Sequence, residues 1–205
     1  MTALARPPAP TGDGLVLTHG AGTDADAPLL VALAEAFAAV GLAVLRYELP
    51  FRRARPTGPP SPASAAADRE GLRQAAQSLR ASLAGRVFLG GHSYGGRQAS
   101  ILAASEPRLV DALLLLAYPL HPPRRPGELR IAHFAELRTP ALFVHGSRDP
   151  FGSLDELEAA RQLIPARTAL LAVEGAGHDL RGGRAGRAGS VAVTVAEAFV
   201  RFVGA

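Results

Sequence analysis

Short apolar runs alternate with longer segments of helical periodicity along the 205 residues of the chain. In the longer segments, apolar residues recur three or four positions apart, as Leu29, Leu33 and Phe37 do, which predicts amphipathic helices. The short runs end at glycine, histidine or other turn residues, which predicts buried strands. Strands are predicted at 15–18, 43–47, 86–89, 112–117, 141–145 and 168–173, and helices at 29–40, 65–83, 97–105, 128–137, 153–163 and 191–202.

Six strands alternating with helices are typical of an α/β fold with a doubly wound, mainly parallel sheet. Residues 1–13 are predicted to be disordered or extended, and residues 14–205 to form one α/β domain. The proline-rich stretch 49–64 is interpreted as an internal loop, because the roughly fifty residues before it are too few for a core of their own.

The stretch 86–96 predicts a strand, a sharp glycine-rich turn and the start of a helix. Its centre, Gly91-His92-Ser93-Tyr94-Gly95, matches the G-x-S-x-G nucleophile elbow. A serine on so tight a turn is held in strained backbone, and its hydroxyl projects from the path of the chain. The residues two before and two after it approach each other closely, which favours glycine at Gly91 and Gly95.

Two further polar residues follow later strands and complete a candidate catalytic set. Ser93 follows the third predicted strand, Asp149 the fifth and His178 the sixth, so all three lie at one rim of a parallel sheet. This is the order of nucleophile, acid and base in α/β-hydrolases. A neutral histidine removes the serine proton during attack, and the carboxylate orients the imidazole. Asp179 and Glu174 are competing acids on the same turn as His178.

The loop after the first predicted strand, His19-Gly20-Ala21-Gly22, is the candidate for the second half of an oxyanion hole. We expect the backbone N–H of Ala21, or that of Gly20, to act together with the N–H of Tyr94. A dinucleotide-binding fingerprint is the rival interpretation of these glycines. Its G-x-G-x-x-G spacing fails at Ala25.

The amino-acid composition argues against several other classes of function. All 22 basic residues are arginine, the net charge is +4 and the sequence pI is about 10.5. Arginine, alanine and proline are all abundant, which indicates a compositional bias rather than a nucleic-acid surface, and aromatic residues do not interleave a basic stripe. There is no cysteine, and no apolar run is long enough to cross a membrane. We expect a cytoplasmic protein without metal, cofactor or nucleic-acid partner.

Arginines gather on the loops that follow predicted strands, where a substrate would arrive. A positive rim attracts anionic substrates, and guanidinium groups bind carboxylates through paired hydrogen bonds. The candidate substrate-binding residues are His19, Gly20, Arg52, Arg53 and Arg148, within a wider set that also holds Arg55, Arg124, Arg125, Arg181, Arg184 and Arg187. A small acyl substrate, anionic in this hypothesis, is the expected partner.

Six motifs together resemble a known group of proteins. They are His19-Gly20-Ala21-Gly22, Arg46-Tyr47-Glu48-Leu49-Pro50-Phe51, Gly91-His92-Ser93-Tyr94-Gly95-Gly96, Tyr118-Pro119-Leu120-His121-Pro122-Pro123, His145-Gly146-Ser147-Arg148-Asp149-Pro150-Phe151 and Gly177-His178. The chain resembles α/β-hydrolases of the dienelactone-hydrolase-like kind. It is most similar to the small hydrolase-like domains shared by bacteria, the eukaryotic non-specific-lethal complex subunit and its testis-expressed relative.

The resemblance implies a minimal α/β-hydrolase with a Ser93–His178–Asp149 triad. The stretch between Ala117 and Ala141 is too short for a helical cap, so we expect an open, cap-less site. The predicted activity is hydrolysis of carboxylic esters or related acyl compounds through an acyl-enzyme. Two alternatives stay open: a hydrolase fold used as an interaction module with little turnover, and a cofactor-free perhydrolase. The oligomeric state is not predicted.

Overall fold

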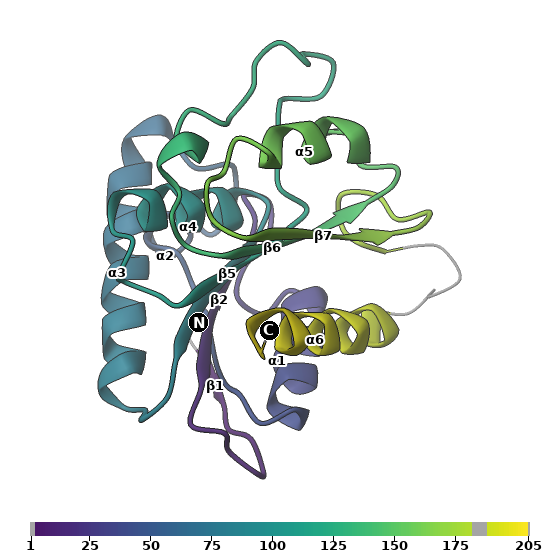
Figure 1. The fold of residues 1–205 in the computed structure, drawn as a ribbon. Helices are drawn as coiled ribbons and strands as arrows, with labels where there is room; N and C mark the ends of the chain where they lie inside the picture. The colour runs from purple at the N-terminus through teal and green to yellow at the C-terminus, as the bar shows by residue number, and fades with distance from the viewer. Residues whose placement is uncertain (1–2, 182–187, 205) are drawn as a thin grey trace.

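A twisted sheet of seven strands forms the middle layer of the protein (Figure 1). The computed structural model describes residues 3–181 and 188–204. The strands are β1 (Ala3–Ala5), β2 (Gly14–Thr18), β3 (Ala43–Tyr47), β4 (Val87–His92), β5 (Ala112–Leu116), β6 (Ala141–Gly146) and β7 (Thr168–Val173). Their order across the sheet is β1-β3-β2-β4-β5-β6-β7. β1 pairs antiparallel with β3, and the other neighbours pair in parallel.

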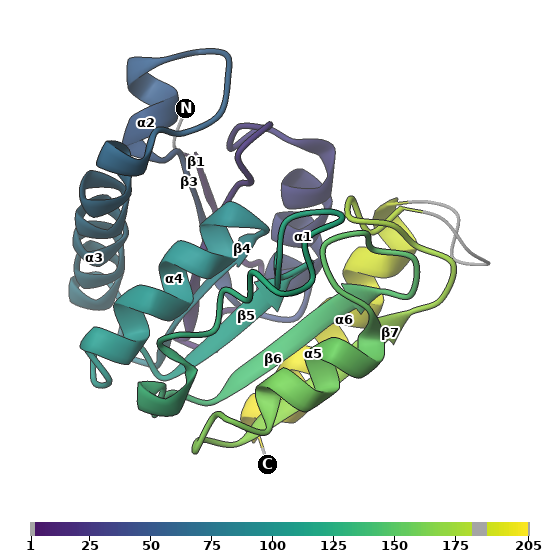
Figure 2. The ribbon, with the colours of Figure 1, turned by 90° about the horizontal axis from the view of Figure 1, so that it is seen from above.

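Helices cover both faces of the sheet (Figures 1 and 2). They are α1 (Pro28–Ala39), α2 (Pro50–Ala54), α3 (Ala65–Ala81), α4 (Tyr94–Ser105), α5 (Leu154–Arg161) and α6 (Ala188–Gly204), with short 3-10 turns at Pro62–Ser64 and Phe134–Glu136. One core packs α3, α4 and α5 against the sheet, and the other packs α1 and α6 against its opposite face. The doubly wound α/β class predicted from the sequence is therefore confirmed.

The winding direction reverses between β2 and β4. The chain leaves β2 toward β3 on one side and leaves β4 toward β5 on the other, although β2 and β4 are hydrogen-bonded neighbours. The two following loops therefore diverge and leave a crevice at the carboxyl ends of these strands. Ligands bind at such switch points in open α/β sheets. The fold thus places the loop at Gly20 and the turn at Ser93 on either side of one crevice.

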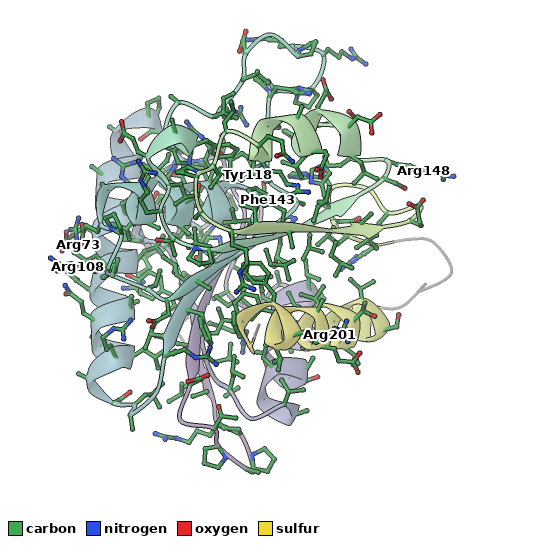
Figure 3. The ribbon with its side chains drawn as sticks, viewed as in Figure 1. Arg73, Arg108, Tyr118, Phe143, Arg148 and Arg201 are labelled. Atoms are coloured by element: carbon green, nitrogen blue, oxygen red, sulfur yellow. The ribbon has the colours of Figure 1, made fainter. Side chains whose placement is uncertain are left out.

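Aromatic clusters fill both cores. On the α1 and α6 face, Phe199 makes edge contacts with Phe37 and Phe88, with ring centroids 5.7 and 5.2 Å away. On the other face, Tyr118 contacts Phe143 at 5.9 Å, and Figure 3 shows both side chains inside the molecule. Such edge contacts add to the free energy gained by burying the rings themselves.

The prediction of six strands was one strand short. The seventh, β1, lies in the segment predicted to be disordered or extended, and three residues are too few to show any periodicity. Residues 1–2 lie outside the described part of the chain. The loop predicted at 49–64 also contains the short helix α2.

The helix predicted at 128–137 was wrong, since only the turn Phe134–Glu136 is helical there. The reason is a competing set of hydrogen bonds. The Arg130 N–H donates to the Leu120 carbonyl at 2.8 Å, and the Tyr118 hydroxyl donates to the Arg130 carbonyl at 2.7 Å. The backbone of Arg130 is therefore bound to the 118–120 loop and is not free for a helical ladder.

Truncation of Phe199 tests the aromatic core. We expect Phe199→Ala to lower the free energy of unfolding by about 3–5 kcal/mol, because it removes a fully buried ring and leaves a cavity. Val193→Ala on the same helix is the matched control, since Val193 is 50% exposed and should change stability by less than about 0.5 kcal/mol. Urea unfolding measures both, and equal effects would contradict the assigned packing of α6.

Candidate active site

Three side chains from three separate loops meet at the carboxyl edge of the sheet. The Oγ of Ser93, directly after β4, lies 2.8 Å from Nε2 of His178. The Nδ1 of His178, after β7, lies 2.8 Å from Oδ2 of Asp149, after β6. The structure thus brings the three residues singled out in the sequence into one hydrogen-bonded chain. In this chain Nδ1–H donates to the carboxylate and Nε2 accepts from the serine hydroxyl.

Asp149 is the acid that contacts His178. Its side chain is 0% exposed, and its second oxygen accepts a hydrogen bond from the Phe151 N–H at 2.9 Å. The Phe151 ring stacks on the imidazole with centroids 4.1 Å apart, which fixes the plane of His178. Asp179 is 63% exposed and accepts from the Arg181 N–H instead. The structure therefore pairs His178 with Asp149 rather than with Asp179.

Ser93 lies on a strained turn. Its φ of 51° and ψ of −116° fall in a region that side chains with a Cβ rarely adopt. A Cβ on Gly91 would lie 2.6 Å from the Gly96 nitrogen, and one on Gly95 would lie 2.5 Å from the His19 carbonyl oxygen. These are backbone atoms that cannot move aside. The close approach expected from the sequence is thus a property of the fold.

Two backbone N–H groups of the cavity that Ser93 lines have no acceptor among the described residues. The Tyr94 N–H begins α4, where helical N–H groups have no intrahelical partner. The Gly20 N–H donates to Thr23 Oγ1 at 3.2 Å, whereas the Ala21 N–H has no acceptor among the described residues. Of the two donors considered from the sequence, Ala21 is the one left free. Gly20 packs closely against the elbow, since a Cβ there would lie 2.9 Å from Nδ1 of His92.

His19 supports this loop from beneath. Its ring is fully buried, with Nδ1 2.8 Å from the Gly20 carbonyl oxygen and Nε2 3.1 Å from the Leu49 nitrogen. Nδ1 therefore donates and Nε2 accepts. Burial lowers the pKa of His19, which keeps the ring neutral as this pattern requires. Both nitrogens are engaged inside the protein, so His19 holds the loop in place.

Arg52 clamps the same loop. Its guanidinium donates to the carbonyl oxygens of Thr23 at 3.0 Å and Ala21 at 2.6 Å. It also donates to the carbonyl oxygens of Arg55 at 3.2 Å and Pro56 at 2.9 Å. Arg52 is buried, and these four contacts join the Ala21 loop to the segment after α2. The structure thus gives Arg52 a positioning role.

Among the other candidate substrate-binding residues, Arg53 and Arg148 lie in the described part of the chain. The guanidinium of Arg53 stacks on the Tyr47 ring at 4.9 Å. Arg148 is exposed, and Figure 3 shows its side chain extending away from the body of the protein. Arg184 and Arg187 lie outside the described residues. A substrate contact by Arg53 or Arg148 stays a prediction.

A cavity of about 480 Å³ opens beside Ser93. Two of its lining residues, Arg97 and Arg130, are absent from the candidates drawn from the sequence. Arg97 could have been found from the sequence, because a residue four positions after Ser93 on a helix lies on the same face one turn later. Arg130 could not have been found in this way, since its position depends on the path of the loop after β5. The walls also include Ala21, Tyr94, Pro60 and Phe151.

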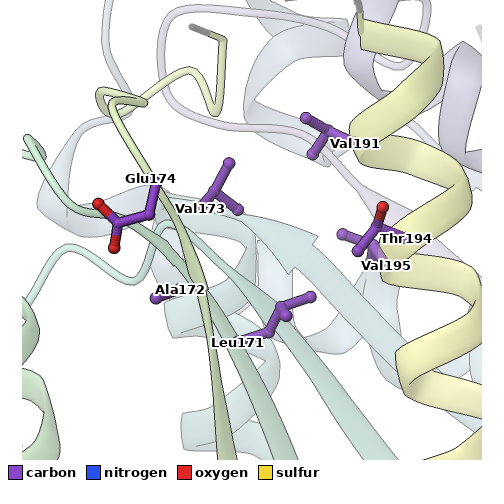
Figure 4. A pocket seen from close by; sticks show the side chains of 7 residues that line it. All are labelled: Leu171, Ala172, Val173, Glu174, Val191, Thr194 and Val195. Atoms are coloured by element: carbon purple, nitrogen blue, oxygen red, sulfur yellow. The ribbon is translucent and has the colours of Figure 1, made fainter. Parts of the chain in front are cut away.

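A second pocket of about 270 Å³ lies between β7 and α6 at the edge of the sheet (Figure 4). Its walls are mostly apolar, with Glu174 and Thr194 as the polar side chains. It holds no nucleophile paired with a base, so we do not assign catalysis to it. Within 3–181 and 188–204, no group of three or more His, Cys, Asp or Glu side chains is placed to hold a metal ion. The same part of the chain contains no helix long and apolar enough to span a membrane.

A family model for the alpha/beta hydrolase domain matches residues 12–202, so the chain belongs to this family. Solved structures share the fold along nearly the whole chain. Est1E from Butyrivibrio proteoclasticus, solved with ferulic acid, has 15% identity and a TM-score of 0.78, covering 100% of this chain and 96% of its own. Dienelactone hydrolase from Anabaena variabilis has 21% identity and a TM-score of 0.75, covering 98% and 91%.

A third similar structure is XC6422 from Xanthomonas campestris, described as an α/β serine hydrolase without a lid. It has 16% identity and a TM-score of 0.72, and the match covers 100% of this chain and 89% of that protein. At these identities the likeness establishes the fold. The sequence prediction of a dienelactone-hydrolase-like α/β-hydrolase is confirmed at the level of family and structural neighbours.

Replacement of the elbow glycine tests the strained turn. We expect Gly91→Ala to lower the free energy of unfolding by about 1–3 kcal/mol, because its Cβ meets backbone atoms of α4. Gly127→Ala is the matched control, since nothing lies within 4 Å of a Cβ there. Its effect should stay within about 0.5 kcal/mol. Chemical denaturation compares them, and a Gly91→Ala protein as stable as the control would refute the close approach.

Acid should destabilise the protein partly through His133. Burial, with a smaller contribution from the Arg97 charge, lowers the pKa of His133 to about 4 in the folded state, against about 6.5 in the unfolded chain. The unfolded chain therefore takes up the proton first, and stability is lost as the pH falls from about 6.5 to about 4. The loss is at most about 1.4 kcal/mol per pH unit, and solvent access to the ring reduces it.

His133→Gln should remove this contribution while keeping a donor toward Ser100, which lies 2.8 Å from His133 Nε2. Urea unfolding of both proteins between pH 4 and 7 measures the effect. The two stability curves should converge toward acid, and parallel curves would mean that His133 titrates alike in both states.

Proposed function

We propose that this α/β-hydrolase is a serine esterase that cleaves small carboxylic esters with Ser93 as nucleophile, His178 as base and Asp149 as the orienting acid. The observation that carries the proposal is the continuous hydrogen-bonded chain from Asp149 through His178 to Ser93. The free N–H groups of Ala21 and Tyr94 support it. The likeness to structures of an esterase and a dienelactone hydrolase agrees with this class of chemistry.

In the first half of the proposed reaction, Ser93 Oγ attacks the ester carbonyl carbon. Its proton passes to His178 Nε2, and the resulting imidazolium is stabilised by the Asp149 carboxylate. The carbonyl oxygen becomes an oxyanion, which the N–H groups of Ala21 and Tyr94 and the N-terminus of α4 stabilise. The intermediate then expels the alcohol, which takes the proton from His178, and Ser93 carries the acyl group.

In the second half, water attacks the acyl carbon and gives its proton to His178. The second oxyanion collapses, the proton returns to Ser93 Oγ, and the carboxylic acid leaves. No cofactor enters this scheme, because side chains supply the nucleophile and the base, and backbone N–H groups stabilise the negative charge. The mechanism requires His178 to be neutral before each attack, because a protonated imidazole cannot accept the serine proton.

The open architecture supports a small, accessible substrate. The segment between β5 and β6 contains only one helical turn among its residues, so no helical cap covers Ser93. The expectation of a cap-less site rests on this short connection. The relation to the non-specific-lethal complex subunit and a cytoplasmic location stay predictions from the sequence.

An interaction module without turnover is the less favoured alternative. Strained backbone costs about 1–3 kcal/mol per residue and persists where the surrounding structure enforces it. Ser93 has such backbone, and its hydroxyl contacts a histidine that is itself oriented by a buried carboxylate. An interaction surface requires none of these features.

Labelling with a fluorophosphonate tests the proposal. Ser93 should be the modified residue, Ser93→Ala should not react, and His178→Ala should lower kcat on 4-nitrophenyl butyrate nearly as much as Ser93→Ala does. Asp149→Asn should lower kcat by up to about 10⁴-fold. Asp179→Asn is the control and should stay within a few-fold of the parent protein. Stoichiometric labelling of Ser93→Ala would overturn the assignment.

A further inference from the structure

The cavity beside Ser93 is lined by two arginines and by no aspartate or glutamate. Arg97 comes from α4, and Arg130 comes from the loop between β5 and β6. The other polar side chains of its walls are neutral, as in Ser61 and Gln98. The cavity that receives a substrate therefore carries positive charge close to the nucleophile.

Arg97 lies one helical turn after Ser93. The Arg97 N–H donates to the Ser93 carbonyl at 3.0 Å, so the two residues are one turn apart. One turn of four residues rises about 6 Å, so the two residues lie near each other on α4. Both line the cavity. The charge of Arg97 also acts on Arg130, so the two arginines of the cavity lie near each other.

Arg97 has spare hydrogen-bonding capacity. It forms no ion pair with any carboxylate in the described part of the chain, and its buried Nε has no hydrogen-bond partner there. A buried donor without an acceptor costs free energy. Its charge is not neutralised locally: it helps to lower the pKa of His133 and that of Arg130, although burial is the larger cause in both. An anion in the cavity would neutralise this charge.

Arg130 is fixed in place by its backbone, which is bound to Tyr118 and Leu120 as described above. Its side chain reaches only the Pro119 carbonyl oxygen, at 3.4 Å. Like Arg97, it makes no ion pair with a carboxylate in the described residues. Two like charges held in one cavity repel each other unless an anion lies between them.

We infer that Arg97 and Arg130 form an anion subsite that binds a free carboxylate of the ester substrate. The inference rests on the proposed esterase function and narrows its substrate class to esters that carry a second, ionised carboxyl group a few bonds from the scissile carbonyl. Guanidinium groups match the planar carboxylate through paired, charge-assisted hydrogen bonds. Arg52, by contrast, already donates hydrogen bonds to backbone carbonyl oxygens.

Turnover of matched esters tests the subsite. One pair is ethyl hexanoate and monoethyl adipate, with the carboxylate on the acyl part; the other is butyl acetate and 4-acetoxybutyrate, with it on the alcohol part. We expect the charged member of at least one pair to have the higher kcat/KM. In Arg97→Gln and Arg130→Gln, the charged-to-neutral ratio should fall about 10- to 100-fold. In Arg97→Lys the ratio should fall less, because lysine keeps the positive charge but cannot form the paired hydrogen bonds of a guanidinium group.

Arg108→Gln is the matched control. It removes the same charge from an exposed arginine on the outer flank of the molecule (Figure 3), and its ratio should match that of the parent protein. The subsite would be overturned if the neutral ester of both pairs had the higher kcat/KM. It would also be overturned if Arg97→Gln and Arg108→Gln had equal charged-to-neutral ratios of kcat/KM. Hydrolysis of the neutral esters would still support the esterase proposal in that case.

Binding to the Ser93→Ala protein separates the subsite from catalysis. Calorimetry should show tighter binding of the charged ester than of its neutral partner, weakened about tenfold or more when Arg97→Gln is added. Higher salt should reduce the difference. Charged binding that depends on Arg97 without any turnover would support the subsite and refute the esterase. Equal binding of both esters would refute the subsite.

Discussion

Close backbone contact at the nucleophile elbow is the constraint on which the site depends. β4 ends against the start of α4, and the end of β2 presses on the same turn, so a Cβ at Gly91 or Gly95 would collide with backbone. This contact fixes the direction of α4 relative to the sheet. It therefore sets the backbone strain of Ser93, the free N–H of Tyr94 and the place of Arg97 one helical turn later. One steric contact thus aligns nucleophile, helix terminus and cavity wall.

Buried polar groups hold the segments around this turn in place. Asp68 accepts hydrogen bonds from the Phe51 N–H at 2.9 Å and from the Tyr94 hydroxyl at 2.7 Å, which ties the start of α3 to the segment after β3 and to the elbow. His145 lies under Asp149, with Nε2 2.8 Å from the Gly152 carbonyl oxygen. Directional bonds as well as apolar packing thus hold these segments in place at the carboxyl edge.

The sequence predicted most of the fold, because the strands are continuous apolar runs and the long helices have clear periodicity. It also predicted that Ser93, Asp149 and His178 would lie together, since each directly follows a parallel strand. It could not predict β1, which is three residues long, or the loss of the helix at 128–137, which depends on hydrogen bonds to a distant loop. Arg130 was missed for the same reason, and the role of Arg52 could not be seen because its acceptors are backbone carbonyls.

The clamp made by Arg52 has a consequence for the timing of the proposed reaction. The loop at Ala21 is fixed by bonds that form when the chain folds, not when a substrate arrives. A loop held in this way needs no rearrangement as negative charge develops on the substrate. Electrostatic preorganisation of this kind shifts the entropic cost of ordering the loop from each catalytic cycle to the single event of folding.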